Sequence, residues 1–237
     1  MAGVFDFKKE YRDLYAPKTM PGLIDVPEMV FIMVDGKGNP NTSEEYKSAV
    51  EILYGLSYAI KMSKKGGVQP AGYFDYVVPP LEGLWWLRDG SEAWYADKDK
   101  YFWTSMIRQP EFVDASVFET ARTELAKKKP TLDFSRARLE TYVEGLCVQM
   151  MHIGSYDDEP KTITAITQYM VDNGYISDSS DKRRHHEIYL SDPRKVAPEK
   201  IRTIIRHPVT KYVFLLATAP AAKPYLCAEA SPKQAAT

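Results

Sequence analysis

The stretch VDGKGNPNTSEEY (residues 34–46) and the stretch MHIGSYDDEPKTI (residues 151–163) follow the same plan. In each stretch an apolar strand ends at a glycine-bearing turn, an acidic or capping cluster follows, and a helix begins. The apolar run from Met29 to Val34, stopped by Gly36 and Gly38, is typical of a strand buried on both faces. Because the plan recurs in the second half of the chain, the sequence predicts an internal duplication.

The first copy continues as a helix and then as strands. EEYKSAVEILYGLSYAIKMSKK (residues 44–65) places its apolar residues at helical spacing. Thr42 and Ser43 are cap candidates for this helix, and Glu45 completes a capping box with Thr42. We expect strands at residues 71–78, 82–88 and 101–107, followed by a helix that Asp114 caps and that runs to Ala126.

The second copy has the same order of elements. RARLETYVEGLCVQMMHIG (residues 136–154) is interpreted as a long strand that breaks or bulges at Gly145. A helix follows, with Ile163, Ile166 and Met170 on its inward face. The remaining expected elements are a strand at HHEIYL (185–190), a short helix from Pro198 to Arg206 and a last strand at KYVFLLA (211–217).

Two β–α–β–β (βαββ) units in one chain predict an α+β protein with a pseudo-twofold axis. We expect the duplicated domain to span residues 27–218, with its repeats at about 27–130 and 137–218. Residues 1–26 are interrupted by prolines and are interpreted as an N-terminal leader that packs on the domain. Residues 219–237, rich in Ala, Pro and Lys, are expected to form a flexible tail.

Composition excludes several classes of protein. The chain has 237 residues with 31 basic against 32 acidic side chains, whereas binding a nucleic-acid backbone needs a basic excess on one face. No stretch approaches the roughly 18–20 consecutive apolar residues that span a bilayer. With Cys147 and Cys227 as its only cysteines, the chain lacks a disulfide framework. We therefore expect a cytoplasmic protein without nucleic-acid or membrane partners, and the even charge favours a monomer.

Aromatic residues, at 12% of the chain, are unevenly distributed. Ten of them, including all four tryptophans, lie between Tyr73 and Trp103. On a strand at residues 101–107, Tyr101 and Trp103 share one face, while Phe102 lies on the other. Such a sheet is either buried on both faces or has one face that lines a ligand cavity, and composition alone favours the core.

The run RRHHEIYL contains the most informative charged group. On a strand, His185, Glu187 and Tyr189 project to one face and His186 to the other. Three interpretations of Glu187 are open: part of a solvated strand, a metal ligand, or a pocket carboxylate, which burial would fit for base work or for pairing with a cation. A metal site is the least favoured, because it needs a third ligand and His152 is the only further obvious donor.

Two further side chains have competing explanations. His152 lies at a strand-to-helix turn, where a histidine is more often a structural hydrogen-bonding group than a catalyst. Tyr142 shares a strand face with Glu144 and is a candidate for a phenol that faces a ligand. The sequence contains no glycine-rich phosphate loop and no serine nucleophile elbow.

Four segments stand out in order: FDFKKEYRDLYAPKTMPGLIDVPEMVFIMVDGKGNPN (5–41), LEGLWW (81–86), VQMMHIGSYDDEPKTI (148–163) and HHEIYLSDPRKVAPEKIRTIIRHPV (185–209). Together they resemble the GyrI-like small-molecule-binding family from about Phe5 to Val213. The resemblance implies a duplicated βαββ fold with a ligand cleft on its axis. In relatives this domain is the effector-binding half of multidrug-responsive transcription regulators. Residues 1–26 leave no room for a helix-turn-helix, so the chain looks like a stand-alone member.

The resemblance also implies an activity and a set of site residues. Some stand-alone members of the subgroup resemble hydrolases that open the cyclopropane ring of cyclopropylpyrroloindole-type alkylating toxins, a reaction that needs no metal or organic cofactor. The family's pocket glutamate corresponds to Glu187, which we expect to act as the base, with Tyr142 or Tyr189 as its partner phenol. The expected substrate contacts are Trp85, Trp103, Tyr73, Tyr101, His152 and Tyr189.

One rival function uses the same side chains. A carboxylate among aromatic rings also binds lipophilic cations by charge pairing and cation–π contact. The sequence is therefore compatible with a non-catalytic multidrug-binding or sequestering module, or with an effector sensor that lacks a DNA-binding domain. It also leaves open whether the loop at residues 88–100 covers the site.

Overall fold

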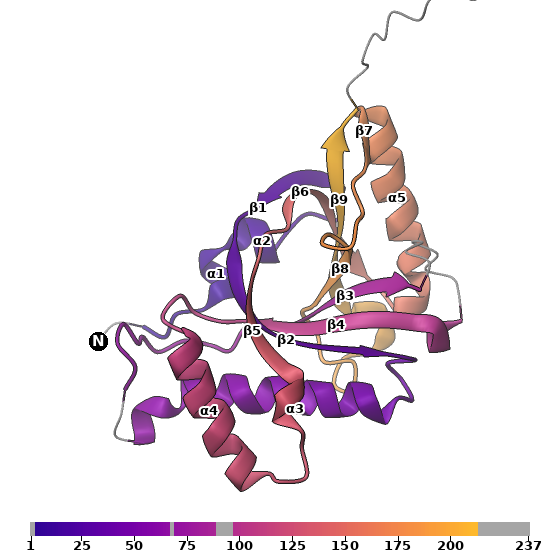
Figure 1. Cartoon of the computed structure of the whole chain (residues 1–237). Coiled ribbons are helices and arrows are strands. Elements are labelled where there is room, and N and C mark those ends of the chain that lie inside the picture. The colour runs from indigo at the N-terminus through magenta and orange to yellow at the C-terminus, as the bar shows by residue number, and fades with distance from the viewer. Residues whose placement is uncertain (1–2, 67–68, 89–96, 213–237) are drawn as a thin grey trace, which may run out of the picture.

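The computed structural model describes residues 3–66, 69–88 and 97–212 and consists of a large curved sheet with helices against it (Figure 1). The strands are β1 (Gly22–Val26), β2 (Met29–Lys37), β3 (Leu81–Leu87), β4 (Tyr101–Arg108), β5 (Ala137–Tyr142), β6 (Gly145–Ile153), β7 (Tyr175–Ser177), β8 (His185–Tyr189) and β9 (Arg202–Lys211). The α-helices are α1 (Phe7–Glu10), α2 (Arg12–Tyr15), α3 (Glu44–Lys61), α4 (Ala115–Lys128) and α5 (Glu159–Asp172). Short 3₁₀ turns occur at residues 63–66, 98–100, 134–136, 156–158 and 198–200.

The order of the strands in the sheet is symmetric about its centre. The strands lie in the order β1-β6-β9-β8-β3-β4-β2-β5, with β7 paired to β9. From the centre outward, β3, β4 and β2 of the first unit mirror β8, β9 and β6 of the second, and all these pairings are antiparallel. The predicted duplication of the βαββ unit is therefore confirmed, and its pseudo-twofold axis passes between β3 and β8.

The strand before each unit crosses to the other unit. β1 leads into β2 but pairs with β6, while β5 leads into β6 but pairs with β2. One register runs through both junctions, from Gly22↔Gln149 at one end to Val34↔Ala137 at the other. Through these two junctions the chain itself joins the ends of the sheet, so the strands form a ring in which β1 and β5 each pair with one neighbour. Closure removes most of the free edges that would otherwise pair with another chain.

Helices cover the outer face of this ring. α3 packs on β2 and β4 with α4 beside it, and α5 packs on β6, β7 and β9 (Figure 1). The apolar helix faces predicted from the sequence are buried, and the buried residues include Leu53, Leu56 and Ile60 of α3 and Ile163, Ile166 and Met170 of α5. Burial of each such side chain contributes roughly 1.5–3 kcal/mol relative to leaving it exposed.

The inner face of the ring is filled from the N-terminus. Phe7 of α1 and Leu14 and Tyr15 of α2 are buried there, against Phe31 of β2 and Met106 of β4. This part of the chain also supplies β1, which the sequence analysis did not predict. Its five residues alternate weakly between exposed and buried positions, so the sequence carries little strand signal there.

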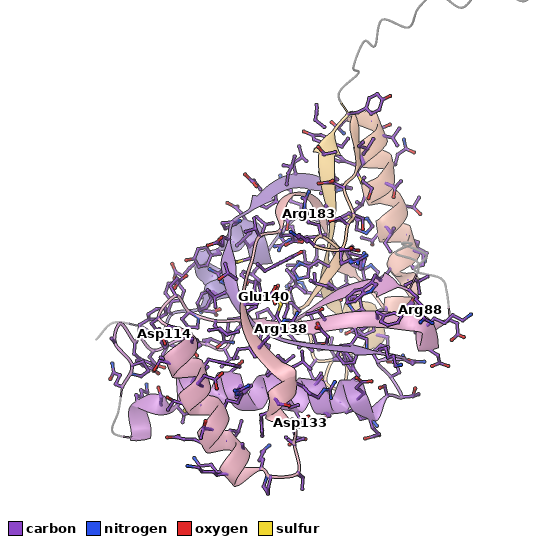
Figure 2. All side chains as sticks on the ribbon, viewed as in Figure 1. Arg88, Asp114, Asp133, Arg138, Glu140 and Arg183 are labelled. Atoms are coloured by element: carbon purple, nitrogen blue, oxygen red, sulfur yellow. The ribbon has the colours of Figure 1, made fainter. Side chains whose placement is uncertain are left out.

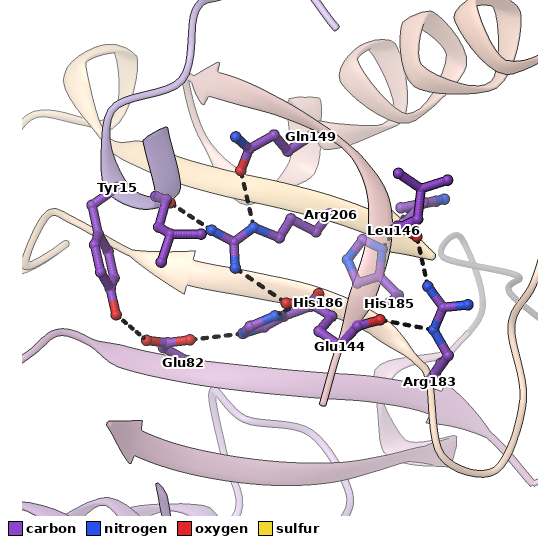
Figure 3. Close-up of polar contacts among 11 residues, drawn as sticks. Tyr15, Glu82, Glu144, Leu146, Gln149, Arg183, His185, His186 and Arg206 are labelled. Carbon is purple, nitrogen blue, oxygen red and sulfur yellow. Dashed lines mark hydrogen bonds and ion pairs between the residues drawn. The ribbon is translucent and has the colours of Figure 1, made fainter. Parts of the chain in front are cut away.

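A buried polar network lies within the inner face, behind β8 (Figure 3). The imidazole of His186 lies between two carboxylates, with Nδ1 2.9 Å from Oε1 of Glu144 and Nε2 3.0 Å from Oε2 of Glu82. Arg206 of β9 pairs with Glu144 at 3.1 Å and donates to the main-chain oxygen of Leu14. These contacts join β3, β8 and β9 to the N-terminal helices and hold the central strands in place.

Residues 71–78, predicted as a strand, do not form one. A single bridge joins Tyr76 to Phe5 in this segment. Both β3 and β4 already have a strand neighbour on each side, so they offer no edge to a further strand. The segment instead crosses the inner face as irregular chain, where Tyr76 is fully buried.

Residues 198–206, predicted as a helix, are mostly strand. Only Pro198–Lys200 is helical, as a 3₁₀ turn, and β9 follows. The spacing of Ile201, Ile204 and Ile205 fits a helix, but β-branched residues also favour strands. Hydrogen bonding to β6 on one side and β8 on the other decides between the two structures in favour of the strand.

Several sequence predictions concern residues outside the described part of the chain. The last strand, expected at 211–217, has only Lys211 within β9, and residues 213–217 fall beyond the described range. The expected tail at 219–237 and residues 89–96 of the loop after β3 also lie outside it.

The helix caps differ from the prediction in one detail. Ser43 caps α3 by accepting a hydrogen bond from the main-chain N–H of Tyr46. Glu45 takes no part in a capping box, because its side chain pairs with Arg136 at 3.2 Å. Asp114 caps α4 as predicted and lies at the start of that helix in Figure 2.

Candidate functional site

The candidate site lies where β3 and β8 meet on the pseudo-twofold axis. Glu187 of β8 is directly opposite Gly83 of β3. Since side chains alternate along a strand, His185, Glu187 and Tyr189 project to the helix-covered face, while His186 joins the inner network. The site and the buried network are therefore two faces of the same pair of strands.

Five aromatic residues gather at this place. Trp85 of β3 donates from Nε1 to the hydroxyl oxygen of Tyr189 at 2.9 Å. The ring of Trp85 also contacts Tyr46 of α3 and Tyr101 of β4, with a centroid distance of 5.9 Å to each. Tyr156, just before α5, packs edge-on against Tyr189 at 6.0 Å. The aromatic cluster, as we call these five residues, thus draws on both repeats.

Two carboxyl groups lie beside the aromatic cluster. Glu187 is 9% exposed, and its Oε1 lies 3.0 Å from Nε2 of His185. Glu159 is the first residue of α5 and has a buried Oε1. Burial, and then the charge of Glu187, raise the pKa of Glu159 well above its ordinary value. Glu159 therefore keeps its proton to a higher pH than an exposed carboxyl group does.

The same two causes act on the phenols. Burial, and then the charge of Glu187, raise the pKa of Tyr156 to about 12. They also raise the pKa of Tyr101 and of Tyr189 above the ordinary value. All three tyrosines are consequently neutral near pH 7, so each carries a hydroxyl hydrogen that can be donated.

Gly83 leaves room beside Trp85 and Tyr189. A β-carbon at this position would lie 2.7 Å from Nε1 of Trp85 and 3.1 Å from the hydroxyl of Tyr189. We expect Gly83→Ala to displace the indole, break the Trp85–Tyr189 bond and weaken ligand binding by roughly tenfold. Calorimetric titration with ethidium, a flat aromatic cation, measures this.

The matched control for that variant is Gly22→Ala. Gly22 lies in β1, and a β-carbon there would meet nothing within 4 Å. We expect it to leave the affinity for ethidium unchanged. If Gly83→Ala binds as tightly as Gly22→Ala, the space at Gly83 has no part in ligand binding.

The structure brings some of the predicted site residues together, namely Glu187, Trp85, Tyr101 and Tyr189. Trp103 lies beneath them. It is fully buried, packs edge-on against Tyr46 at 5.0 Å, and covers Gly36, where a β-carbon would lie 2.2 Å from the ring. Trp103 therefore supports the aromatic cluster from the core and does not form its surface.

Two other predicted residues lie away from Glu187. Tyr142 packs against Phe31 at 6.3 Å in the inner cluster, on the opposite face of the sheet from Glu187. Tyr73 donates to the main-chain oxygen of Lys61 at the C-terminal end of α3. The structure thus pairs neither phenol with the carboxylate, whereas Tyr189 is on the same strand face as Glu187.

His152, also predicted to contact the substrate, is held in the turn before α5. Its Nδ1 lies 2.8 Å from the hydroxyl of Thr162 and its Nε2 lies 2.9 Å from the main-chain oxygen of Ser155. It borders an open hollow of about 410 Å³ that is also lined by Thr19 and Glu199. Nδ1 is therefore engaged by α5 and Nε2 by the turn before it.

Sequence reasoning missed three residues of the site. Tyr46, Tyr156 and Glu159 lie in segments that the sequence analysis assigned to a helix or to a turn, without giving them a role in the site. All three lie at the starts of the helices that follow the duplicated turns. Their position after the duplicated turns could have identified them, because a twofold axis through the central strands brings the starts of both helices to one place.

The site offers a carboxylate, neutral hydroxyl groups and aromatic faces. These groups suit a flat apolar molecule or an aromatic cation. Within the described ranges, no group of three or more His, Cys, Asp or Glu side chains could hold a metal ion. In the same ranges, no helix has the length and apolar character needed to cross a bilayer.

A duplicated βαββ fold with an aromatic and acidic site on its axis defines a protein that binds small molecules. The sequence profile of the GyrI-like small-molecule-binding domain matches residues 19–210. The chain belongs to this family, which confirms the resemblance found in its four segments.

Solved structures from Listeria innocua are closely similar. One is a hydrolase that is 50% identical, with a TM-score of 0.80, and the match covers 87% of this chain and 100% of that chain. Another is an uncharacterized conserved protein that is 51% identical, with a TM-score of 0.82 and the same coverage of 87% and 100%. No curated protein sequence matches the chain.

Proposed function

We propose that this protein binds flat, hydrophobic or cationic small molecules at the aromatic cluster and hydrolyses the cyclopropane ring of cyclopropanoid genotoxins. The observation that supports this most directly is the position of Tyr189 beside Glu187. Trp85 donates to the hydroxyl oxygen of Tyr189, so the hydroxyl hydrogen is directed away from the indole and is available to an acceptor on a ligand. A carboxylate and a neutral donor on one strand face supply a base and an acid.

The reaction needs only these groups. Water attacks the cyclopropyl carbon of a spirocyclopropyl dienone, so that a C–O bond forms and a ring C–C bond breaks. The electron pair of the broken bond aromatises the dienone and places negative charge on its oxygen. Glu187 takes the proton from water, and Tyr189 donates to that oxygen. A general base contributes roughly 10²- to 10⁴-fold and an oriented donor on the order of 10²-fold.

Two further points concern whether the protein is an enzyme and which role it has in the cell. The 50%-identical structure from Listeria innocua is that of a hydrolase, which favours an enzyme over a passive binder. We propose detoxification as the role, carried out by a cytoplasmic monomer without a metal or organic cofactor. The second candidate, a non-catalytic module that binds or senses lipophilic cations, is favoured by the largely buried Glu187 beside five aromatic rings.

Replacing Tyr189 by Phe tests the proposed acid. We expect Tyr189→Phe to lower kcat for a cyclopropanoid substrate by roughly 10²-fold, because the developing oxyanion loses its donor. Tyr142→Phe is the matched control, since Tyr142 lies on the other face of the sheet, and it should keep the kcat of the wild type. Chromatography with mass detection measures the product, which is heavier than the substrate by one water.

Two outcomes would contradict these assignments. If Tyr142→Phe loses turnover and Tyr189→Phe keeps it, the phenol on the inner face acts and the site is wrongly placed. If the wild-type protein leaves the substrate intact while ethidium still binds, the chain is a binding module and not a hydrolase.

A further inference from the structure

Two buried histidines stand in line behind Glu187. Nε2 of His185 lies 3.0 Å from Oε1 of Glu187, and Nδ1 of His185 lies 2.8 Å from Nε2 of His207. His185 and His207 are 1% and 3% exposed. The neighbouring strand pairs His186↔Arg206 and Glu187↔Ile205 place His207 of β9 opposite His185 of β8. The three side chains therefore form a continuous hydrogen-bonded line across the two strands.

The direction of the hydrogen bonds in this line depends on which ring nitrogens donate and which accept. Burial, and then the proximity of His185, lower the pKa of His207 well below its ordinary value, so His207 is neutral. If Nε2–H of His207 donates to Nδ1 of His185, then Nδ1 is the acceptor, and the hydrogen of His185 lies on Nε2 and is donated to Glu187. In the reverse direction, a His185 ring with a single hydrogen would present a bare Nε2 to a carboxylate oxygen 3.0 Å away, and two acceptors would face each other.

We propose that His185 is a positioning residue for Glu187, and that His207 fixes the tautomer in which His185 does this. One carboxylate oxygen, Oε1, is then held by the imidazole, so Oε2 is directed toward the ligand. A histidine whose second nitrogen is engaged has a defined tautomer and a defined ring orientation. Glu187 would otherwise rotate about its side-chain torsions, and its base function would be spread over many orientations.

The catalytic consequence of this inference rests on the proposed hydrolysis, but the tautomer does not. The first experiment is therefore spectroscopic and uses the full chain without substrate. The chain contains four histidines, so long-range ¹H–¹⁵N correlation spectra resolve each imidazole, and single variants assign them. We expect His185 to carry its hydrogen on Nε2. A hydrogen on Nδ1 of His185, whether in the neutral ring or in an imidazolium, would overturn the proposal.

The second experiment compares two replacements of His207 that differ little in size. His207→Leu removes the donor to His185, and we expect kcat to fall by roughly 10-fold with KM unchanged. His207→Gln supplies an amide donor in a similar place, and we expect it to recover kcat to within about threefold of the wild type. A side chain needed only for packing would give the same result with Leu and Gln.

The outcomes separate this inference from the proposed function. If the wild type has no hydrolase activity, the proposed function fails, and the tautomer of His185 still decides the positioning role. If the wild type is active and His207→Leu keeps full kcat, the positioning role fails while the hydrolase stands. If His207→Leu does not fold, the spectrum of the wild-type protein remains the deciding measurement.

Discussion

Replacing Glu187 by Gln is expected to lower kcat for a cyclopropanoid substrate by roughly 10²- to 10⁴-fold, because an amide does not take the proton from the attacking water. Glutamine has nearly the same size, and its amide oxygen still accepts a hydrogen bond from His185. The melting temperature and the affinity for a neutral substrate should therefore stay close to those of the wild type. Initial rates followed by chromatography measure the loss.

Glu140→Gln is the matched control for this variant. Glu140 lies in β5, where its side chain is 48% exposed and pairs with Arg138 (Figure 2). Turnover should be unaffected there. Full turnover by Glu187→Gln would show that the carboxylate assignment is wrong even though the activity is real. Binding provides a second readout, because Glu187→Gln should weaken ethidium more than a neutral ligand of similar shape.

The alternation of residues along single strands predicted the central part of the site. HHEIYL is a strand in which Glu187 and Tyr189 share a face, and LEGLWW is a strand whose Trp85 reaches Tyr189. These residues lie in uninterrupted strands, so a period of two assigns their faces correctly. The sequence was sufficient where the backbone is regular and only local pattern is needed.

The same rule fails for Tyr142 because the strand is interrupted. In one continuous strand, Tyr142 and Val148 would project to the same face. The chain instead breaks between β5 and β6, and Gly145 takes φ +68°. Val148 packs beneath α5, whereas Tyr142 packs against Phe31 on the inner face. A break at Gly145 was predicted, but not that it reverses which face the earlier residues occupy.

The residues that helices contribute to the site could be predicted only from the topology of the whole sheet. Tyr46 and Glu159 are far apart in the sequence, and each lies in the first turn of a helix in a different repeat. Only the symmetric strand order, with β3 beside β8, brings these helix starts together. Local patterns carry no information on that order, because it depends on pairing between strands that are far apart in the sequence, such as β3 with β8.

Arg206→Met is expected to be the most destabilising of the substitutions considered. Arg206 is 1% exposed and donates to Glu144, to Gln149 and to the main-chain oxygen of Leu14. Methionine fills similar space but leaves Glu144 paired with His186 alone. Breaking a buried ion pair from one side costs about 3–5 kcal/mol, which lowers the melting temperature by on the order of 10 °C in a chain of this size.

The pH dependence of stability reports on the same network. Burial lowers the pKa of His186, but Glu144 and Glu82 more than offset this and raise it to about 9. Its contribution is fully present below about pH 6.5 and is lost as the pH rises through about 9. Burial raises the pKa of Glu144, but His186 and Arg206 more than offset this and lower it to about 2. That contribution is present above about pH 4.5 and is lost as the pH falls toward 2.

Arg138→Met is the control that separates the loss of stability caused by breaking the buried network from the general effect of removing an arginine. Arg138 also contacts two carboxylates, Asp35 and Glu140, but its side chain is 39% exposed, so its loss should cost about 1 kcal/mol or less. Urea unfolding of both variants between pH 3 and 9 makes the comparison. Without Arg206 the pKa of Glu144 should rise, so acid unfolding should begin at a higher pH than in the wild type or in Arg138→Met. If both variants unfold at the same urea concentration and with the same pH dependence, the buried charges behind β8 do not hold the central strands together.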